Sequence, residues 1–333
     1  MRRVLFYSLL IISSLTALAQ KPHVKGLNTI NIESAKAHIN FLAHDELEGR
    51  EAGFQGGRVA REYIISRLTE LNVQPFFDGK YTQPFEAVKV DHQRKGRFHV
   101  HPDSISELKK DTHQALQMNN VLGFIPGKNS NEYVIVGAHY DHLGLDPYLA
   151  GDQIYNGADD NASGVSAVLQ IAKAFVMSGQ QPQRNVVFAF WDGEEKGLLG
   201  SKFFVQEYDK LDQVKGYLNF DMIGRNNKPD QPKHVVYFYT EANPVFGEWL
   251  KTDIEKYKLE LEPDYRAWDK PVGGSDNGSF AKHNIPIIWY HTDWHKDYHK
   301  PTDHAELLNW EKVVEITKAS FLNMWHMAND KSF

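Results

Sequence analysis

The chain has 333 residues, of which 41 % are hydrophobic and 24 % are charged, which fits a folded globular protein and excludes an intrinsically disordered one. The formal net charge of -6 gives no support to nucleic acid or an anionic membrane as a partner. No cysteine is present, so disulfides, thiol catalysis and thiolate metal ligands are all excluded.

The N-terminus has the three parts of a secretory signal peptide. Arg2 and Arg3 give a positive start, residues 4–15 are apolar, and residues 17–19 (Ala-Leu-Ala) offer a cleavage site between small residues. The apolar stretch is too short for a stable membrane span, which needs roughly 20 residues. An N-terminal anchor left in place is the alternative interpretation. We therefore predict a signal peptide over residues 1–19 and export to the periplasm or the outside of the cell.

The first part of the mature chain combines helices with an irregular region. Apolar residues near helical spacing predict helices over Ile32–Leu42 and Gln55–Leu71, separated by the polar turn HDELEGREAG. Residues 72–119 are polar and irregular, with short strand-like pieces such as FEAVKV and RFHVH.

From about residue 120 onward, apolar strands alternate with helices. The predicted strands are Tyr133–His139, Asn185–Trp191, Tyr217–Gly224, His234–Thr240 and Ile285–His291, and the predicted helices are Ser163–Val176, Pro244–Lys258 and Trp310–Met327. This alternation predicts an α/β fold with a mixed, mostly parallel sheet covered by helices on both faces. No internal repeat or low-complexity linker divides the chain, so we predict one domain over residues 20–333.

Polar residues follow the predicted strands, at the edge where open α/β sheets place their ligand sites. They are His139 and Asp141 in GAHYDH, Asp159 and Asp160 in NGADDNASG, Glu194 and Glu195 in DGEEKG, Asp221 in FDMIG, and His291, His295, His299 and His304 near the C-terminus. Histidines and carboxylates are together the donors that zinc and similar divalent cations prefer. The set therefore predicts a metal site.

Each motif also has a structural interpretation when taken alone. The DDNASG loop could be a calcium loop, but Gln170 stands where a bidentate acid is required, so that interpretation fails. The same loop could cap a helix, since acids stabilise helix N-termini. Because one carboxylate can be shared by two cations, we expect Asp159 to bridge two metal ions and Asp160 to hold the loop in place.

These motifs resemble the M28-type metallopeptidases, the co-catalytic zinc aminopeptidase family. The matching stretches are GAHYDH, NGADDNASG, FWDGEEKGLLGS, NFDMIGR and DYHKPTD, in the family's order, and LAHDELEGREAGFQGG resembles the segment that precedes them in bacterial members. The resemblance implies two divalent ions, expected to be Zn²⁺, held by His139, Asp159, Glu195, Asp221 and His299. It also implies a cis peptide bond between Asp159 and Asp160.

The resemblance assigns further roles around these ligands. Glu194 would be the general base that accepts a proton from the attacking water. Asp141 would orient His139, as carboxylates commonly orient metal-bound histidines. Tyr298 would help to stabilise the oxyanion, and Asp303 would support the neighbouring histidine ligand.

The expected substrates are peptides, and an aminopeptidase is favoured because no arginine clamp for a free C-terminal carboxylate is recognised. Arg225 would revive the carboxypeptidase alternative if it bound that carboxylate. Asp276 is a candidate contact for the substrate ammonium group, and Asn277 stands where the family commonly has histidine, which concerns specificity. Aromatic candidates for a side-chain pocket are Tyr155, Trp268, Phe280 and Trp294.

Two other functions compete with a peptidase. Glutaminyl cyclase-like acyltransferases resemble the same family but bind one zinc ion and lack the His139-type ligand. A non-catalytic binding protein on the same scaffold would have lost ligands or the general base. Residues 80–120 are too few for a complete inserted protease-associated domain, and no nucleic acid partner or stable membrane span after signal removal is expected.

Overall fold

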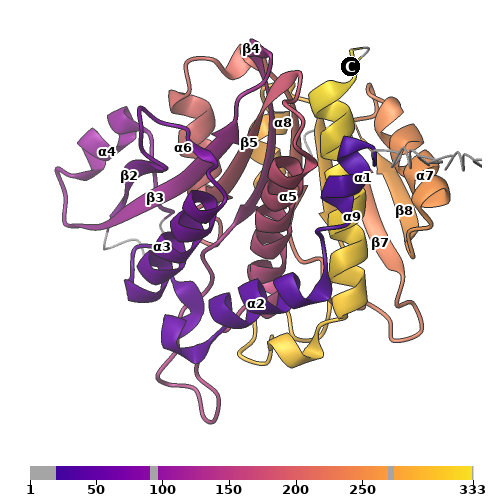
Figure 1. The fold of residues 1–333 in the computed structure, drawn as a ribbon. Helices are drawn as coiled ribbons and strands as arrows, with labels where there is room; N and C mark the ends of the chain where they lie inside the picture. Colours follow the sequence, from indigo (N-terminus) through magenta and orange to yellow (C-terminus); the bar gives the residue numbers. More distant parts are fainter. Residues whose placement is uncertain (1–19, 91–96, 269–273, 332) are drawn as a thin grey trace, which may run out of the picture.

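A computed structural model describes residues 20–90, 97–268, 274–331 and 333, so the predicted signal peptide lies outside the described residues (Figure 1). The helices are α1 (Pro22–Leu27), α2 (Ile32–Leu42), α3 (Gln55–Glu70), α4 (Pro102–Leu108), α5 (Gly164–Ser178), α6 (Leu199–Glu207), α7 (Val245–Tyr257), α8 (Asn277–Ala281) and α9 (Trp310–Asn329). The strands are β1 (Gln74–Pro75), β2 (Thr82–Val90), β3 (His113–Ile125), β4 (Asn129–His139), β5 (Arg184–Trp191), β6 (Val214–Phe220), β7 (His234–Tyr239), β8 (Glu262–Ala267) and β9 (Ile287–His291). Short 3-10 or π turns cover Asp45–Arg50, Ala158–Ser163, Leu211–Gln213 and Ala305–Leu307.

All strands of the described chain join one sheet in the order β1-β3-β5-β4-β6-β9-β7-β8, with β2 paired to β3. The four central strands β5, β4, β6 and β9 are parallel to one another. Antiparallel pairs flank them, β3 against β5 on one side and β7 against β9 on the other. The predicted mixed, mostly parallel α/β sheet is confirmed.

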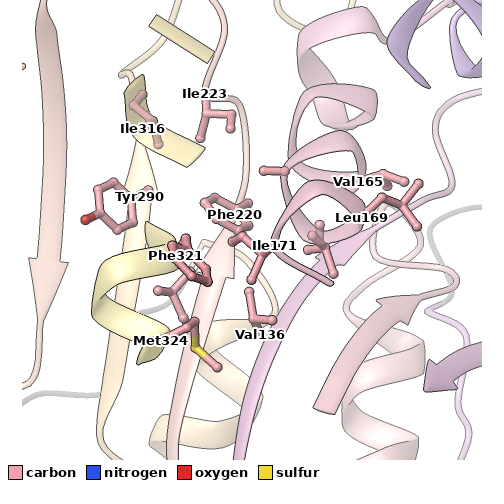
Figure 2. Packing of buried hydrophobic residues seen from close by; sticks show 14 of the residues in the cluster. Val136, Val165, Leu169, Ile171, Phe220, Ile223, Tyr290, Ile316, Phe321 and Met324 are labelled. Atoms are coloured by element: carbon pink, nitrogen blue, oxygen red, sulfur yellow. The ribbon is translucent and has the colours of Figure 1, made fainter. Parts of the chain in front are cut away.

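Helices cover both faces of this sheet (Figure 1). The larger apolar cluster joins α2, α3, α5, α7 and α9 to one face, and Figure 2 shows Val136, Leu169, Phe220 and Phe321 within it. A second cluster places α6 and α8 against the other face through Phe204 and Phe280. Because both faces are buried, the central strands are apolar without interruption, as in β5, where every residue is buried.

The helix boundaries of α2 and α5 follow from their local sequences. The side chain of Asn31 accepts a hydrogen bond from the Ser34 N–H at 2.8 Å and so caps α2. Helix α5 follows the π turn Ala158–Ser163 directly and ends at Gly179, whose φ of 70° suits a helix C-terminus. None of the helices in the described part of the chain has the length and apolar character that crossing a bilayer requires.

The structure departs from the sequence-based elements in several places, including the following two. Residues 72–119, expected to be irregular with short strand-like pieces, contain β2, which includes FEAVKV, and much of β3, and the two strands pair along the length of β2. The strand predicted over Tyr217–Gly224 ends at Phe220, and Met222 has a φ of 57°, which an extended strand does not allow.

Candidate metal centre

The parallel strands bring the candidate donors to one edge of the sheet. His139 ends β4 and pairs with Trp191, the last residue of β5, while Ala138 pairs with Phe220, the last residue of β6. Asp221 follows Phe220 directly, so it lies next to the end of β4. This is the carboxyl edge where ligand sites of open α/β sheets occur.

The carboxylate of Asp160 lies between two groups of donors. Its Oδ1 is 3.3 Å from His139 Nε2, and Asp221 Oδ1 is 3.6 Å from the same nitrogen. Its Oδ2 is 3.3 Å from His299 Nε2, which is in turn 3.1 Å from Glu195 Oε2. One potential ligand atom from each of His139, Asp160 and Asp221 lies within 4.8 Å of the others. Asp160 therefore belongs to both groups.

His142 is a residue of this centre that the sequence-based prediction missed. His142, Asp160 and Glu195 also have potential ligand atoms within 4.8 Å of one another. His142 Nδ1 donates to Glu195 Oε1 at 2.7 Å, so the other oxygen of Glu195 remains directed at His299. The signal was its position three residues after His139, just beyond the strand, in the quoted motif GAHYDH.

The structure corrects the expected role of Asp159. Its Oδ1 accepts a hydrogen bond from the Gly224 N–H at 2.5 Å, and its Oδ2 is 3.3 Å from His295 Nε2. Asp159 thus faces away from the two donor groups, and Asp160 occupies the place between them. The cis peptide bond also lies one residue later than expected, between Asp160 and Asn161. Adjacent residues in this irregular turn point in different directions, which their spacing could not reveal.

Asp303 supports the loop rather than the histidine beside it. Its Oδ2 accepts hydrogen bonds from the backbone N–H groups of Asp159 at 2.9 Å and Asp160 at 3.1 Å. Its carbonyl oxygen accepts a third from the Ala158 N–H at 3.0 Å. The expectation that Asp303 supports His299 is replaced by this contact with the loop.

Asp141 connects the end of β4 to the Glu194-Glu195 turn. His139 Nδ1 donates to the carbonyl oxygen of Asp141 at 3.1 Å, while the Asp141 carboxylate is 3.7 Å from that nitrogen. The carboxylate accepts hydrogen bonds from the backbone of Glu194 at 3.0 Å and Glu195 at 3.4 Å. Asp141 therefore orients His139 chiefly through its backbone and fixes the acidic turn through its side chain.

A small cavity of about 50 Å³ opens beside the donor groups. It is lined by Asp160, Glu194, Asp221, Met222, Gly274, Trp289, His291, Trp294, Tyr298 and His299. Glu194 lines the cavity without joining either donor group of the described residues. The ring of Tyr298 stacks on His299 at 3.8 Å, which places this tyrosine next to the centre.

The other predicted substrate residues lie outside this cavity. Asp276 is fully buried. Arg225 is 8 % exposed and forms an ion pair with Asp297 at 2.5 Å, so it is not available to a substrate carboxylate. Tyr155 is partly buried, and its N–H donates to the Gly144 carbonyl. None of the three lines the cavity.

Of the aromatic candidates for a pocket, only Trp294 lines it. Phe280 is buried and stacks on Tyr217 at 3.9 Å, and Trp268 packs near Phe238. Trp289, which also lines the cavity, was not anticipated, because its strand looked like ordinary apolar core.

The buried charges of the centre perturb one another. Burial and the neighbouring carboxylates of Asp221, Asp276 and Glu195 raise the pKa of Glu194 well above its usual range, although His139 opposes this. Burial works against a charged His299, yet the carboxylates of Asp160 and Glu195 raise its pKa to about 10. Burial also raises the pKa of Asp160, but three histidines outweigh it and hold that pKa well below the ordinary value.

Unpartnered polar atoms show that these residues fit a bound cation. His139 Nε2 and Asp160 Oδ1 are buried and have no hydrogen-bond partner among the described residues. Buried polar atoms are normally paired, and a divalent cation would provide the missing partner. Histidine nitrogens combined with carboxylate oxygens form a set of ligands that suits zinc.

An α/β sheet with histidine and carboxylate donors at the carboxyl edge of its parallel strands indicates a metal-binding protein, and comparison with known proteins identifies its class as that of the metallopeptidases. The sequence model of peptidase family M28 matches residues 120–324. The chain belongs to peptidase family M28.

Curated relatives include a leucine aminopeptidase and a leupeptin-inactivating enzyme. The chain is 33 % identical over 257 residues to "Leucine aminopeptidase 2" of Trichophyton equinum, an alignment covering 76 % of this chain and 45 % of that protein. It is 32 % identical over 170 residues to "Leupeptin-inactivating enzyme 1" of Streptomyces exfoliatus, covering 50 % of this chain and 34 % of that protein. The chain thus spans less than half the length of these two relatives.

Solved structures share the fold. A zinc aminopeptidase from Bacillus subtilis aligns with a TM-score of 0.67 at 15 % identity, over 91 % of this chain and 97 % of that one. Porphyromonas gingivalis glutaminyl cyclase aligns with a TM-score of 0.63 at 14 % identity, over 89 % of this chain and 98 % of that one. At these identities the likeness concerns the fold alone.

Proposed function

We propose that the chain is a metal-dependent aminopeptidase that removes N-terminal residues from peptides. The observation that carries the proposal is the Asp160 carboxylate, whose two oxygens face two separate sets of histidine and carboxylate donors. Two divalent ions, with Zn²⁺ the best fit to the donors, would be held by His139, Asp160 and Asp221 on one side and by Asp160, Glu195 and His299 on the other. Bound there, the metal would polarise the scissile carbonyl and acidify a water molecule.

The protein's own groups would move the protons. Glu194 lies in the cavity wall outside both donor groups, so its carboxylate is free to accept a proton from the attacking water and return it to the leaving amine. Tyr298 would donate a hydrogen bond from its hydroxyl to the developing oxyanion.

The environment of Arg225 bears on which end of a peptide is cleaved. This candidate clamp for a C-terminal carboxylate is already paired with Asp297. The pairing favours an aminopeptidase over a carboxypeptidase. The presence of a second donor group, formed by Asp160, Glu195 and His299, favours it over a glutaminyl cyclase with one ion.

The test uses one peptide in two forms, with a free and with an acetylated N-terminus, and mass spectrometry of the products. Stepwise loss of N-terminal residues from the free form alone, abolished by chelation and restored by zinc, is expected. The variant Glu194→Gln should keep its metal and lose about 10²–10⁴-fold in kcat. Trimming of both forms from the C-terminus, or no cleavage by metal-loaded protein, would contradict the proposal.

We also propose export, on the strength of the N-terminal sequence alone. Arg2 and Arg3, the apolar stretch and the Ala-Leu-Ala site have the order of a secretory signal. N-terminal sequencing of the protein recovered from an exporting host tests this. Recovery of the chain with residues 1–19 still attached, in the cytoplasmic fraction, would contradict it.

A further inference from the structure

Arg50 is a buried arginine in the segment that precedes the part of the chain matched by the family. It ends the 3-10 turn Asp45–Arg50 and is 1 % exposed. Buried arginines usually pair with carboxylates. The side chain of Arg50 instead donates to backbone carbonyl groups, most of which belong to the metal-site loop or the strand beside it.

The guanidinium binds three segments at once. Its donor nitrogens contact carbonyl oxygens of Leu42 (2.7 Å), Tyr140 (2.9 Å), Asn156 (2.6 Å), Gly157 (2.9 Å) and Asp160 (3.5 Å). Leu42 ends α2, Tyr140 follows β4, and residues 156–160 form the loop that carries the shared carboxylate. The planar, five-donor geometry of arginine makes such a set of contacts possible, and a lysine has no equivalent.

The backbone around Arg50 is built for this placement. Glu48, Gly49 and Arg50 have φ values of 46°, 66° and 48°, in the left-handed region that costs about 1–2 kcal/mol for each residue other than glycine. A Cβ atom at Gly49 would lie 2.2 Å from the Gly144 carbonyl oxygen, so no larger residue fits there. The Arg50 carbonyl accepts from the His142 N–H at 3.2 Å, which connects the same turn to the second donor group.

The charge of Arg50 complements the centre in front of it. Burial lowers the pKa of Arg50 to about 10, while the carboxylates of Asp160, Asp141, Asp303 and Glu195 act in the opposite direction. The guanidinium therefore stays positive at neutral pH, on the protein side of a cluster of carboxylates.

We propose that Arg50 is a positioning residue of the metal centre, which fixes the backbone of residues 156–160 so that Asp160 presents one carboxylate oxygen to each donor group. The inference rests on the proposed function and extends it. It states that Arg50, a residue outside the part of the chain matched by the family, is required for tight metal binding at the centre. Arg50 acts through Asp160 and has no contact with substrate.

The experiment compares Arg50→Met and Arg50→Lys with a matched control, Arg184→Met, in the full chain. Arg184 is also buried and also donates to backbone carbonyls, those of Met327 and Asp330 at 2.8 Å and Phe333 at 2.9 Å. It begins β5, at the end of that strand opposite the centre. Zinc affinity is measured by competition with a chromophoric chelator, and kcat and KM are measured separately with a dipeptide substrate.

Both Arg50 variants are expected to bind zinc about 10–100-fold more weakly, as for other residues that hold metal ligands in place, with kcat reduced and KM little changed. Arg184→Met is expected to lose stability but keep wild-type zinc affinity. If Arg50→Met does not fold, Arg50→Lys decides the question, because it keeps the charge and removes the multiple contacts.

The possible results distinguish failure of the positioning role from failure of the proposed function. Unchanged zinc affinity and kcat in a folded Arg50 variant, or an equal loss in Arg184→Met, overturns the positioning role alone. A wild-type chain that binds no zinc overturns the proposed function, and the inference falls with it. A wild-type chain that binds zinc without cleaving peptides leaves the affinity comparison valid.

Discussion

At the scale of single residues, the neighbours Asp159 and Asp160 provide the sharpest test of the centre. We expect Asp160→Asn to weaken metal binding by more than the 10–100-fold typical of supporting residues, because it alters an oxygen donor of both groups. Asp159→Asn should lower it by less than about tenfold, since the amide oxygen can still accept from Gly224. Zinc titration of both variants measures the difference. Equal losses, or a larger loss at Asp159, would restore the sequence-based assignment.

His142 offers a second prediction at this scale. Removing its imidazole in His142→Ala takes away the 2.7 Å hydrogen bond that holds Glu195 Oε1, so zinc affinity should fall by about 10–100-fold. His304→Ala is the control, because His304 forms a 3.0 Å contact with Asp152 at the surface. The same chelator competition measures both proteins. An unchanged affinity in His142→Ala would show that Glu195 needs no such support.

The residue types of the centre could be predicted from the sequence, but not every position. His139, Glu195, Asp221 and His299 lie together as their strand-end positions indicate, because parallel strands end at one edge. The choice between Asp159 and Asp160 depends on the backbone angles of an irregular turn, where Asp160 has φ −104° and ψ 94°. Those angles are set by contacts with distant residues such as Asp303 and Arg50. Spacing alone contains no information about them.

At the scale of elements, periodicity predicted the segments that are buried on one side or on both. The helix α2 and the strand β5 were found within one residue of their observed ends, because their apolar patterns are strong. The strand-like piece FEAVKV lies in β2, but β3 was missed, since its exposed end carries polar residues and its stability depends on pairing with β2. The short strand β8 was missed for the same reason.

The packing of α2 on α3 gives a prediction about pH. His38 Nδ1 contacts the Tyr63 hydroxyl at 2.8 Å, and burial, with Arg67 and Lys173 nearby, lowers the pKa of His38 from 6.5 to about 4. The unfolded chain therefore binds more protons than the folded chain between these values, so this contribution to stability is present above pH 6.5 and is lost as the pH falls towards 4.

The variant His38→Gln isolates this contribution. Relative to the variant, the wild type should lose about 1–2 kcal/mol of unfolding free energy between pH 7 and pH 4.5, a range reduced for the partial exposure of the side chain. Urea unfolding of both proteins at the two pH values measures it. A difference between them that does not change with pH would contradict the lowered pKa.

At the scale of the whole molecule, metal binding and folding are expected to be coupled. The donors come from the ends of β4 and β6, from the turns after β5 and before α5 and from the segment after β9, so bound ions join distant parts of the sheet. A ligand present at 1,000 times its Kd stabilises the folded state by about 4 kcal/mol. We expect zinc to raise the Tm of chelator-treated protein by roughly 5–15 °C.

Differential scanning calorimetry with and without zinc measures this shift. Asp160→Asn serves as its control and should show a much smaller increase. A Tm that zinc leaves unchanged in the wild type would show that the donors do not bind it in the folded state.

The cavity wall also contains its own optical reporter. Trp294 is 59 % exposed, lines the cavity and makes an edge contact with Tyr298 at 4.4 Å, whereas Trp191 and Trp289 are buried in the sheet. A peptide seated in the cavity would cover the Trp294 indole and shield it from a soluble quencher such as acrylamide. Binding of a peptide to the cavity can then be followed by fluorescence without a label and without turnover. The change in acrylamide quenching on peptide binding should be absent in Trp294→Phe.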